Sequence, residues 1–544
     1  MNGSNKSNER NGSNGSDGRD SSDGAWQVDP EAGPLKLAYA DEMREMDRRT
    51  IEDWGMPGTV LMENAGRSVA AVCEELLDEL PSGPVVIVAG KGNNGGDGFV
   101  VARWLHWAGY DVEVCLLPPL DDLSGDAAIN ARFAERMGVP IHQQATRELL
   151  DDRLSRATLI ADGVLGTGIS GEVRGPAREA VEAMNAAPAP VVAIDIASGV
   201  DADTGAILGE ATRAHTTVTF ALAKVGMYQQ PGRACCGQII VAPIGMSREL
   251  TEAAELRTNL TTSADAEVML PARGANMHKG DAGRLLVIAG SVGMSGAAAM
   301  AALAATRAGA GLVTIACPES LNDILEVKCT EVMTRPMPET AARSLALEGE
   351  DAIVEFAAGM DAVALGPGLS RHEATAELAR RLAARIELPM LIDADGLNAF
   401  AGRAEELRER PAPTVLTPHP GEFARLSGRE VGAIEADRPR SARELAERTG
   451  CVVLLKGAGT VIADPGGEVW INPTGNEGLA CGGSGDVLSG IVGAFLAGGS
   501  GALHAAVAGA YYHGRAADVA AGDGLRGMVP PKLIEVLPRV FATE

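Results

Sequence analysis

Short, almost purely apolar runs recur along the whole chain, and each is followed by a polar or glycine-rich loop and then by a helical pattern. The clearest of these runs are Pro84–Gly90, Val191–Asp195, Leu312–Ala316 and Met390–Asp393. A strand that is apolar on both faces is typical of a parallel sheet that helices cover on both sides. The repeated order of strand, loop and helix therefore predicts an α/β protein built from three-layer domains.

Two breaks in this pattern divide the chain of 544 residues. Residues 1–34 consist mostly of Gly, Ser, Asn and Asp and have too few apolar side chains to form a core, so we expect a disordered tail. The second break, from Ser247 to Pro271, is polar and charged. We therefore predict one α/β domain over residues 35–250 and another over residues 265–544.

Acidic residues outnumber basic residues, 73 to 47, and give the chain a formal net charge of −26. Such a charge disfavours binding to nucleic acid or to an anionic membrane. No apolar run reaches the length needed to cross a bilayer. The eight cysteines are scattered and form no CxxC pair, which is typical of a reduced, cytoplasmic protein.

The segment Asn476–Gly490 combines small residues with a single carboxylate. Four small residues, Gly482–Gly485, run into Asp486, and an apolar helical pattern follows. Small residues allow a tight turn, and the N–H groups at the start of a helix attract anions. A carboxylate at the edge of such a site is suited to removing a proton from a hydroxyl group or to holding a metal. The alternative is a glycine-rich turn in which Asp486 only caps the helix.

Three aspartates of the first domain, Asp97, Asp162 and Asp195, follow or end predicted strands. The carboxyl ends of parallel strands meet at one crevice, so we expect these carboxylates to converge there, with Asn94 and Ser198 as neutral oxygen donors. Clustered oxygen donors without soft ligands suggest a hard cation. Any one of these aspartates alone could be a helix cap.

Two glycine-rich loops in the same domain favour contacts with a ligand. Lys91–Gly98 lies between a strand and a helix, as in a Rossmann-like unit, although its Asn and Asp residues depart from the GxGxxG fingerprint. Gly166–Gly171 matches GxGxxG, but the next helix starts only at Pro176. We interpret the first as a nucleotide-contacting loop and the second as a substrate loop.

In the second domain a histidine and a lysine stand at predicted strand ends. His419 lies between two prolines, which hold its backbone extended and rigid. Lys456 precedes a glycine-rich turn and could hold a phosphate, with a surface lysine as the alternative. Two anion-type loops and a carboxylate together suit phosphoryl transfer to a hydroxyl group.

The motifs of the two domains resemble those of two known families. Residues 38–248 resemble the NAD(P)H-hydrate epimerase family through Leu61–Gly66, Asn93–Gly98, Gly166–Glu172 and Asp195–Val200. Residues 265–540 resemble the NAD(P)H-hydrate dehydratase family through Gly366–Leu369, Pro418–Glu422, Lys456–Thr460 and Gly482–Leu488. In this order they resemble the bifunctional enzymes that repair nicotinamide nucleotides. The resemblance implies a Rossmann-like first domain and a ribokinase-like second domain.

The resemblance also implies the site residues of the first domain. Those expected to contact the hydrated dinucleotide are Asn93, Asn94, Gly95, Gly96, Asp97, Gly166, Thr167, Gly168, Ile169, Ser170, Gly171, Glu172 and Asp195. Asn94, Asp162 and Ser198 would bind K⁺. Either Asp97 or Asp195 would be the acid–base group. The chain departs from the family at Ala197, where a proline is usual, and this frees the backbone beside Ser198.

For the second domain the resemblance implies two sets of contacts. The hydrate would contact Ala297, Gly368, His419 and Asp486. The adenine nucleotide would contact Lys456, Gly457, Ala458, Gly459, Thr460 and Gly485. Asp486 would be the catalytic base, and Mg²⁺ would accompany ADP, the co-substrate.

The implied activity is the repair of hydrated NADH and NADPH. The first half would interconvert the R and S hydrates, and the second half would dehydrate the S form at the expense of ADP, giving NAD(P)H, AMP and phosphate. We expect a cytoplasmic homo-oligomer that binds neither nucleic acid nor membrane. The alternative is a vitamin or sugar kinase in the second half, joined to a non-catalytic nucleotide-binding module in the first half.

Overall fold

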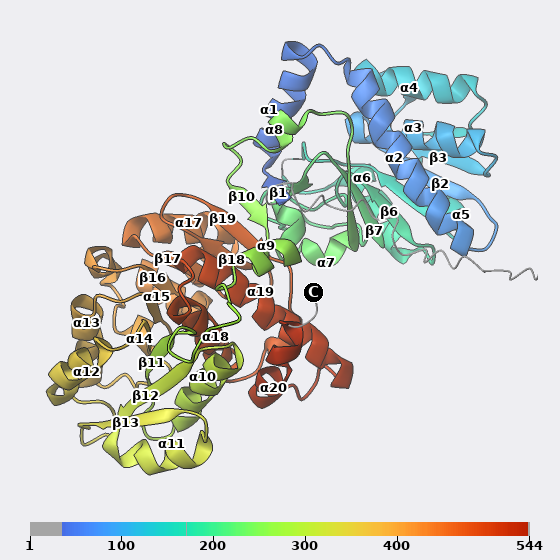
Figure 1. The fold of residues 1–544 in the computed structure, drawn as a ribbon. Coiled ribbons are helices and arrows are strands. Elements are labelled where there is room, and N and C mark those ends of the chain that lie inside the picture. The colour runs from blue at the N-terminus through green and yellow to red at the C-terminus, as the bar shows by residue number, and fades with distance from the viewer. Residues whose placement is uncertain (1–34, 170, 542–544) are drawn as a thin grey trace, which may run out of the picture. The chain divides into compact units, whose positions relative to one another are not determined.

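The computed structural model describes residues 35–169 and 171–541. The predicted tail, residues 1–34, lies outside the described residues. The described chain contains two β-sheets, and helices pack on both faces of each sheet (Figure 1). The predicted α/β class with three-layer domains is confirmed.

Within the described residues the first sheet has seven parallel strands, in the order β4-β3-β2-β5-β6-β7-β9. They are β2 (Val85–Ala89), β3 (Val112–Leu116), β4 (Ile141–Gln143), β5 (Leu159–Gly163), β6 (Val191–Ile194), β7 (Thr216–Phe220) and β9 (Gln238–Ala242). The strand order reverses between β2 and β5, because β3 and β4 extend the sheet on one side and β6 extends it on the other. Ligands of open α/β sheets bind beyond the carboxyl ends of the strands at such a reversal.

Alternation along β2 explains how both faces of this sheet are covered. Val85, Ile87 and Ala89 pack on one face, and Val86 and Val88 on the other. The helices on the first face are α2 (Gly58–Glu79), α3 (Asn93–Trp107) and α4 (Gly125–Arg136), and those on the second are α5 (Arg147–Leu154) and α6 (Gly175–Ala186). The helix α1 (Ala40–Arg48) precedes them in the chain.

The second sheet has twelve strands in the described part of the chain, in the order β13-β12-β11-β14-β15-β16-β17-β18-β19-β10-β1-β8. Strands β13 to β17 are parallel, whereas β18 is antiparallel to both β17 and β19. The strands from the second half are β11 (Arg284–Ile288), β12 (Leu312–Pro318), β13 (Met333–Met337), β14 (Ala362–Leu365), β15 (Met390–Ile392), β16 (Thr414–Leu416), β17 (Val452–Leu455), β18 (Thr460–Ala463) and β19 (Val469–Asn472).

Three short strands complete this second sheet: β10 (Thr258–Leu260), β1 (Leu35–Ala38) and β8 (Ala223–Lys224). β10 pairs with β19, β1 pairs with β10, and β8 pairs with β1. Since β1 and β8 belong to residues 35–250, membership of the two sheets does not follow the predicted domain boundary. The boundary itself stays a prediction.

Helices cover the second sheet in the same alternating way, with Leu285 and Val287 of β11 on one face and Leu286 and Ile288 on the other. The first face carries α10 (Ser295–Arg307), α11 (Asn322–Lys328), α18 (Ser484–Ala497), α19 (Ala502–Ala520) and α20 (Pro530–Val540). The second face carries α12 (Glu350–Ala357), α13 (Glu373–Arg385), α14 (Asp395–Asn398), α15 (Pro420–Ser427), α16 (Val431–Glu435) and α17 (Arg438–Thr449).

The helices α10 and α18 pack closely because their facing residues are small. A Cβ atom on Gly490 of α18 would lie 2.1 Å from the carbonyl oxygen of Ala301 in α10, so only glycine fits there. A Cβ atom on Gly483 would likewise lie 2.5 Å from Cε of Met300. The first turn of α18, which carries Asp486, is therefore held directly against α10.

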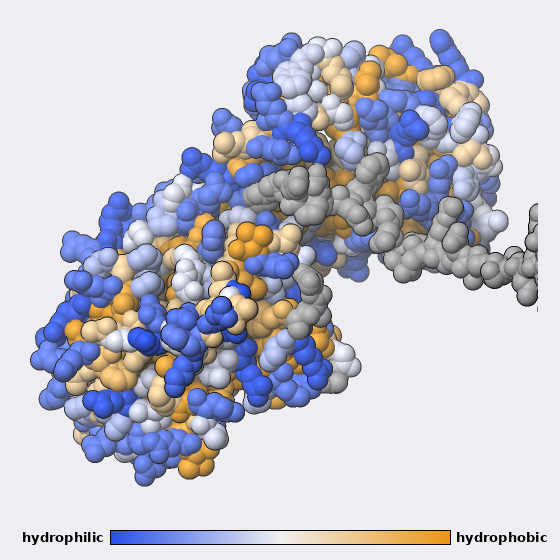
Figure 2. All heavy atoms as spheres, viewed as in Figure 1, coloured by the Kyte–Doolittle hydropathy of each residue, from blue (hydrophilic) through white to orange (hydrophobic). Residues whose placement is uncertain are grey.

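Polar and charged residues cover most of the face shown in Figure 2, and apolar residues form scattered patches between them. No helix among the described residues combines the length and the apolar character that crossing a membrane requires.

Candidate active sites

The first half contains a cavity of about 970 Å³ beyond the carboxyl ends of β2, β5 and β6. The predicted contacts that line it are Asn93, Asn94, Asp97, Gly166, Thr167, Gly168, Ile169 and Asp195. Gly95 and Gly96 pack inside the fold instead, since a Cβ atom on Gly95 would lie 2.1 Å from the carbonyl oxygen of Gly90. Gly171 and Glu172 are not among the lining residues, and Ser170 lies outside the described residues.

Asp195 pairs with a lysine that the sequence analysis did not identify. Lys224 is only 1% exposed, and its Nζ donates hydrogen bonds to Asp195 Oδ1 and, at 2.8 Å, to Thr219 Oγ1. Asp195 has a φ of +67°, which is uncommon for a residue with a side chain, and such strain clusters at functional sites. A buried ammonium and a cavity-facing carboxylate thus form the charged centre of this site.

Two further carboxyl groups face the same cavity. Burial, with the added charges of Asp195 and Asp47, raises the pKa of Asp97 well above its ordinary value. Asp47 comes from α1, and burial followed by the charge of Asp195 raises its pKa to about 6, although Lys224 opposes the shift. The site therefore favours a protonated Asp97 beside the Asp195–Lys224 ion pair.

The three predicted K⁺ ligands lie around the loop that follows β5. Asp162 is fully buried and accepts hydrogen bonds from the backbone N–H (2.9 Å) and the hydroxyl (2.6 Å) of Ser198. Asn94 donates through Nδ2 to the carbonyl of Ile194 at 2.5 Å, and its buried Oδ1 has no hydrogen-bond partner among the described residues. A buried oxygen without a donor is costly unless water or a cation meets it.

The donors at this position fit a monovalent cation better than a transition metal. In the described ranges no cluster of three or more His, Cys, Asp or Glu could hold a metal ion, so neutral oxygens such as Asn94 Oδ1 would dominate the set. Ser198 keeps its place although Ala197 precedes it, because its hydroxyl also accepts a hydrogen bond from the backbone N–H of Leu165 at 2.9 Å. Hydrogen bonds, in place of a proline ring, fix this backbone.

The second half contains a cavity of about 480 Å³ that brings all four predicted hydrate contacts together. Ala297 and Gly368 form part of one wall, and His419 and Asp486 are also among the lining residues. Ala297 belongs to α10 and Asp486 to α18, so the close packing of these two helices places both side chains at the cavity.

Asp486 stands in the first turn of α18, where burial and then the charges of Asp393 and Glu422 raise its pKa to about 7. Lys456 opposes this shift. A Cβ atom on Gly485, the preceding residue, would lie 3.4 Å from Lys456 Nζ. Asp486 therefore lines the cavity, and the preceding residue, Gly485, lies next to Lys456, which was predicted to bind a nucleotide.

A carboxylate network holds Lys456 in place. Its Nζ lies 2.7 Å from Asp393 Oδ1 and 3.8 Å from Glu422 Oε2, and the hydroxyl of Ser489 donates to Asp393 Oδ2 at 2.7 Å. Burial alone would lower the pKa of Lys456, but Asp393 and Glu422 outweigh it and raise that pKa. Lys456 is thus a fixed cation beside Gly485. The rest of the predicted loop, Gly457–Thr460, turns back on itself, as Thr460 Oγ1 donates to the Gly457 carbonyl at 2.8 Å.

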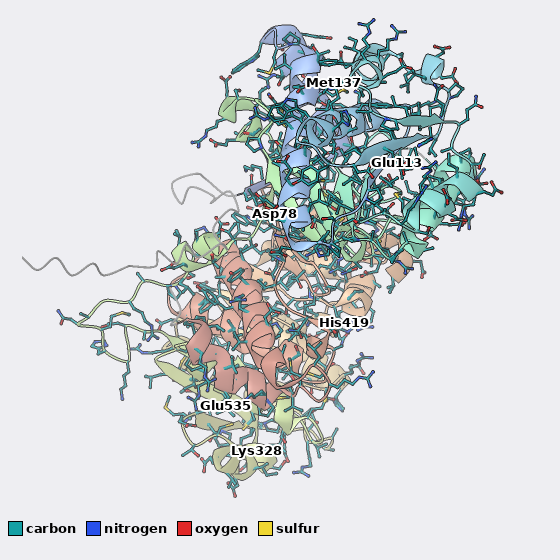
Figure 3. The ribbon with its side chains drawn as sticks, turned by 90° about the vertical axis from the view of Figure 1, so that its right-hand side faces the viewer. Asp78, Glu113, Met137, Lys328, His419 and Glu535 are labelled. Carbon is teal, nitrogen blue, oxygen red and sulfur yellow. The ribbon has the colours of Figure 1, made fainter. Side chains whose placement is uncertain are left out.

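His419, labelled in Figure 3, caps the start of α15. Its Nδ1 accepts a hydrogen bond from the backbone N–H of Gly421 at 3.0 Å. The backbone N–H of His419 donates to Glu422 Oε2 at 2.8 Å. Burial, followed by the positive charges of Lys456 and Arg425, lowers the pKa of His419. A neutral imidazole therefore lines the cavity, and the backbone of His419 is extended, as the two flanking prolines predicted.

Sequence reasoning missed three residues of these sites, namely Asp47, Lys224 and Asp393. Asp393 follows β15, and the strand-end signal that identified Asp162 and Asp195 could have identified it. Lys224 is a lysine inside an apolar stretch, which is also a usable signal. Asp47 lies in a helix that is charged along most of its length, so nothing in the sequence distinguishes it from a solvent-facing aspartate.

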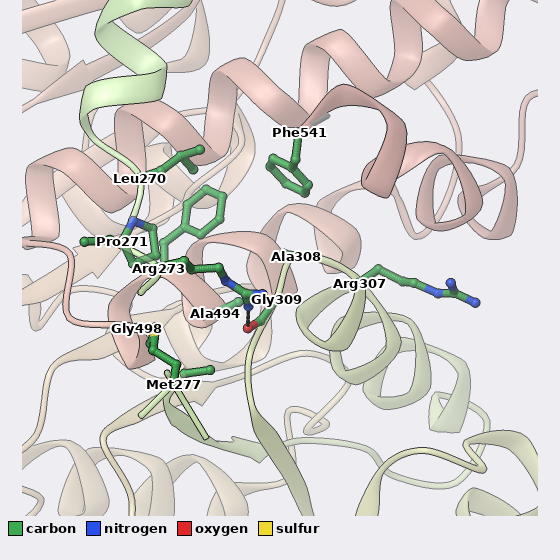
Figure 4. A pocket seen from close by; sticks show the side chains of 13 residues that line it. Leu270, Pro271, Arg273, Met277, Arg307, Ala308, Gly309, Ala494, Gly498 and Phe541 are labelled. Atoms are coloured by element: carbon green, nitrogen blue, oxygen red, sulfur yellow. Dashed lines mark hydrogen bonds between the residues drawn. The ribbon is translucent and has the colours of Figure 1, made fainter. Parts of the chain in front are cut away.

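A smaller cavity of about 290 Å³ in the second half is lined by none of the described site residues (Figure 4). Ala494, Phe495 and Gly498 line it, so it lies at the opposite end of α18 from Asp486. The guanidinium of Arg273 donates a hydrogen bond to the carbonyl of Gly309 there. Its described lining contains no carboxyl group or histidine, and we assign it no acid–base role.

Comparisons with known proteins match a family to each half of the chain. A family model described as "NAD(P)H-hydrate dehydratase" matches residues 285–539, and one described as "YjeF-related protein N-terminus" matches residues 58–226. A curated bifunctional NAD(P)H-hydrate repair enzyme from Moorella thermoacetica is 42% identical over 93% of this chain and 97% of its own length. The chain belongs to the bifunctional NAD(P)H-hydrate repair enzymes. This confirms the family resemblance drawn from the motifs.

Another repair enzyme of this family, from Salinibacter ruber, is 40% identical over 94% of this chain and 97% of its own length. Among solved structures, an ADP/ATP-dependent NAD(P)H-hydrate dehydratase from Bacillus subtilis, co-crystallized with ATP and Mg²⁺, is 33% identical. It covers 51% of this chain and 95% of its own chain, with a TM-score of 0.44.

Proposed function

We propose that this chain repairs hydrated NADH and NADPH by two successive activities. The first half interconverts the R and S hydrates, and the second half dehydrates the S form with ADP, giving NAD(P)H, AMP and phosphate. The observation that carries the proposal is Asp486, which faces a cavity from the first turn of α18 and has a pKa raised to about 7. A base with a pKa near the working pH is suited to accept the proton of a hydroxyl group.

Dehydration near neutral pH needs activation, because hydroxide is a poor leaving group. Asp486 takes the proton of the hydrate's hydroxyl, and that oxygen attacks the terminal phosphorus of ADP, so that AMP leaves. Lys456 and the free N–H groups at the start of α18 offset the negative charge on the transferred phosphoryl group. The ring nitrogen then expels phosphate, and loss of a proton from the neighbouring carbon restores the dihydropyridine.

The carboxylates around Lys456 fit the Mg²⁺ that would accompany ADP. Mg²⁺ in nucleotide sites takes one or two protein carboxylates and completes its shell with phosphate oxygens and water. Asp393 and Glu422, whose oxygens lie 2.7 Å and 3.8 Å from Lys456 Nζ, are the two carboxylates that would do so here. The ion would supply positive charge at the phosphates, and these residues would only anchor it.

Epimerisation in the first half requires the hydroxyl to leave one face of the ring and water to return to the other. We assign the proton donor to Asp97, because its raised pKa favours the protonated form. We assign the base to Asp195, whose carboxylate is paired with Lys224 and is ready to accept a proton from the returning water. K⁺ held by Asn94, Asp162 and Ser198 would supply a fixed positive charge beside the cavity loops.

The decisive experiment uses the purified R and S hydrates separately, with and without ADP. Recovery of the near-ultraviolet absorbance of the reduced nicotinamide ring reports repair. We expect S hydrate to be repaired only with ADP, and R hydrate to follow at the rate of epimerisation. A phosphorylated hydrate that accumulates without recovery of absorbance would favour a kinase in the second half and contradict the proposal.

We retain three broader proposals for this chain. The net charge of −26 supports a partner set without nucleic acid or anionic membrane. A cytoplasmic location and a homo-oligomeric state complete the set, and both can be checked on the native protein by cell fractionation and by light scattering.

A further inference from the structure

Two arginines line the cavity of the second half, and the mechanism above uses neither of them. Arg371 lies in the loop between β14 and α13, and Arg425 lies in α15. Both side chains line the cavity together with Ala297, Gly368 and His419. The carboxyl groups of Asp395, Glu422 and Asp486 line the same cavity, so the two guanidinium groups place positive charge in a lining of mixed charge.

Polar contacts around Asp395 link both arginines, which are themselves exposed. Arg425 donates through Nε to Asn398 Oδ1 at 2.8 Å, and Asn398 donates through Nδ2 to Asp395 Oδ1 at 3.0 Å. Arg371 Nε lies 3.7 Å from the same Asp395 oxygen. The side chain of Asp395 is only 13% exposed, and the backbone N–H of Ser370 donates to its other oxygen at 2.9 Å. One carboxylate therefore orients two cations, and its own oxygens are already engaged.

The terminal nitrogens of Arg425 remain available for a ligand. Arg425 is exposed and forms no ion pair with any described residue, whereas Arg403 and Arg429 pair with glutamates. A Cβ atom on Gly421 would lie 3.7 Å from Arg425 Nη1, so this nitrogen lies near the start of α15, next to His419. A planar guanidinium that is held through Nε presents its two outer N–H edges in the geometry that phosphate oxygens accept.

The groups around the pair leave its positive charge available to an anion. Burial and Lys456, followed by Arg425 and Arg371, lower the pKa of His419, so the neutral imidazole neither adds to nor offsets the charge of the pair. Asp486 and Glu422 line the same cavity but lie on the side of Lys456, whose charge acts on both. Lys456 and Gly485 do not line this cavity within the described chain, which separates the arginine pair from the predicted ADP loop.

We propose that Arg371 and Arg425 form a phosphate subsite that binds the pyrophosphate bridge of the hydrated dinucleotide. The inference rests on the proposed dehydratase function and names the part of the substrate that these arginines hold. Binding at the bridge positions the hydroxyl of the distant ring at Asp486. Such a subsite makes the enzyme select dinucleotides over smaller dihydropyridines.

The test compares Arg371→Ala, Arg425→Ala and the double variant with the wild type, in the full-length chain. Arg403→Ala is the matched control, since Arg403 is a half-exposed arginine that pairs with Glu406 outside the cavity. Substrates are the S hydrates of NADH, of NADPH and of dihydronicotinamide riboside, which has no phosphate. The double variant should raise KM for both dinucleotide hydrates by about 10- to 100-fold, with little change in kcat or in KM for ADP. On the riboside hydrate it should match the wild type.

Four results would overturn the subsite. An unchanged KM for NADH hydrate removes it while leaving the proposed function intact. A rise confined to KM for ADP assigns the arginines to the nucleotide, and a rise confined to NADPH hydrate assigns them to the 2′-phosphate. Equilibrium binding of NADH hydrate without ADP repeats the comparison independently of turnover. The wild type should bind the hydrate at the cavity of each half, and the double variant should lose binding at the cavity of the second half. If the double variant binds as many hydrate molecules as the wild type, the proposal is contradicted, even where the wild type shows no repair.

Discussion

At the scale of single residues, each candidate site pairs a buried lysine with several carboxyl groups that have different environments. Asp486 has a raised pKa beside the Lys456–Asp393 pair, and Asp97 has a raised pKa beside the Lys224–Asp195 pair. Carboxyl groups whose pKa values are shifted in this way are suited to acid–base roles. Positive φ angles at Asp195 (+67°) and at Ala394 (+50°), directly after Asp393, mark strained backbone at both sites.

Replacing Asp486 with Asn should abolish dehydration and spare ADP binding, because the amide keeps the shape of the side chain but cannot accept the hydroxyl proton. We expect a loss in kcat of about 10²- to 10⁴-fold, the usual contribution of a general base. Initial rates with S hydrate and calorimetric titration with ADP measure the two quantities. Asp351→Asn, at a carboxylate whose side chain is 91% exposed, is the control and should change neither.

The pH dependence of dehydration follows from the raised pKa of Asp486. The base works as the carboxylate, so kcat/KM for S hydrate should rise with pH through about 7 and then level off. An ordinary aspartate would give a profile that is already flat across neutral pH. A rate that falls through this range as the pH rises would show that the protonated form is the active one.

Lys224→Met should stop epimerisation while S hydrate is still dehydrated. Lys224 is buried against Asp195, and removing one partner of a buried ion pair usually costs about 3–5 kcal/mol, so the unfolding temperature should also fall. Repair of R hydrate and thermal unfolding are the two measurements. Lys224→Arg retains the charge and shows whether activity depends on the ammonium or only on the fold; full activity in Lys224→Met would contradict the role of the pair.

At the scale of elements, the second site depends on how closely α10 approaches α18. Gly490 allows this approach, and the cavity-lining Ala297 and Asp486 lie on these two helices. The first site depends instead on three loops that follow β2, β5 and β6, which the strand order brings to one edge of the sheet. The position of each site therefore depends on the packing of the backbone, and the side chains that line it depend on that position.

Gly490→Ala should destabilise the second half by about 1–3 kcal/mol, the typical cost of overpacking a filled core. The added Cβ would lie 2.1 Å from the carbonyl oxygen of Ala301, and backbone cannot move aside cheaply. Dehydration should weaken too, because separating the helices shifts Asp486 away from Ala297. Gly432→Ala, in α16, is the control, since a Cβ there meets nothing within 4 Å. Equal unfolding curves for the two variants would refute the packing argument.

At the scale of the whole molecule, two chemically separate cavities act on the two epimers of one substrate. In this scheme the first half converts the R hydrate into the S hydrate that the second half consumes, so the two activities act in succession. The two sites use different aspartates, Asp195 and Asp486, and each can be silenced alone.

On a mixture of R and S hydrates with ADP, the wild type should repair all of the material in one process. Asp195→Ala should consume only the S fraction quickly and then continue at the spontaneous rate, because its epimerase base is gone. The amplitude of the fast phase, followed by near-ultraviolet absorbance, measures the split. An Asp195→Ala variant that repairs the whole mixture at the wild-type rate would refute the assignment of the first half.

Much of the architecture was predictable because long apolar runs carry their own signal. Val85–Ala89 and Leu285–Ile288 are buried on both faces, and such runs predict central parallel strands. The short strands β1, β8 and β10 were not predicted, because two to four residues show no periodicity and their pairing is decided by distant partners. Of the three aspartates that the strand-end rule expected at one crevice, Asp195 and Asp97 line the cavity, the latter from α3, whereas Asp162 is fully buried and does not line it.

Local pattern and parallel connectivity were enough to predict the α/β class and the family, and they pointed to part of the cavity linings, such as Asn94, Asp195 and Asp486. Only the tertiary structure decided that Lys224 pairs with Asp195, that Asp47 shares their cavity, and that Arg371 and Arg425 meet across Asp395 and Asn398. The physical reason is that ion pairing and desolvation depend on distance and burial in space, which residues far apart in the chain acquire only on folding.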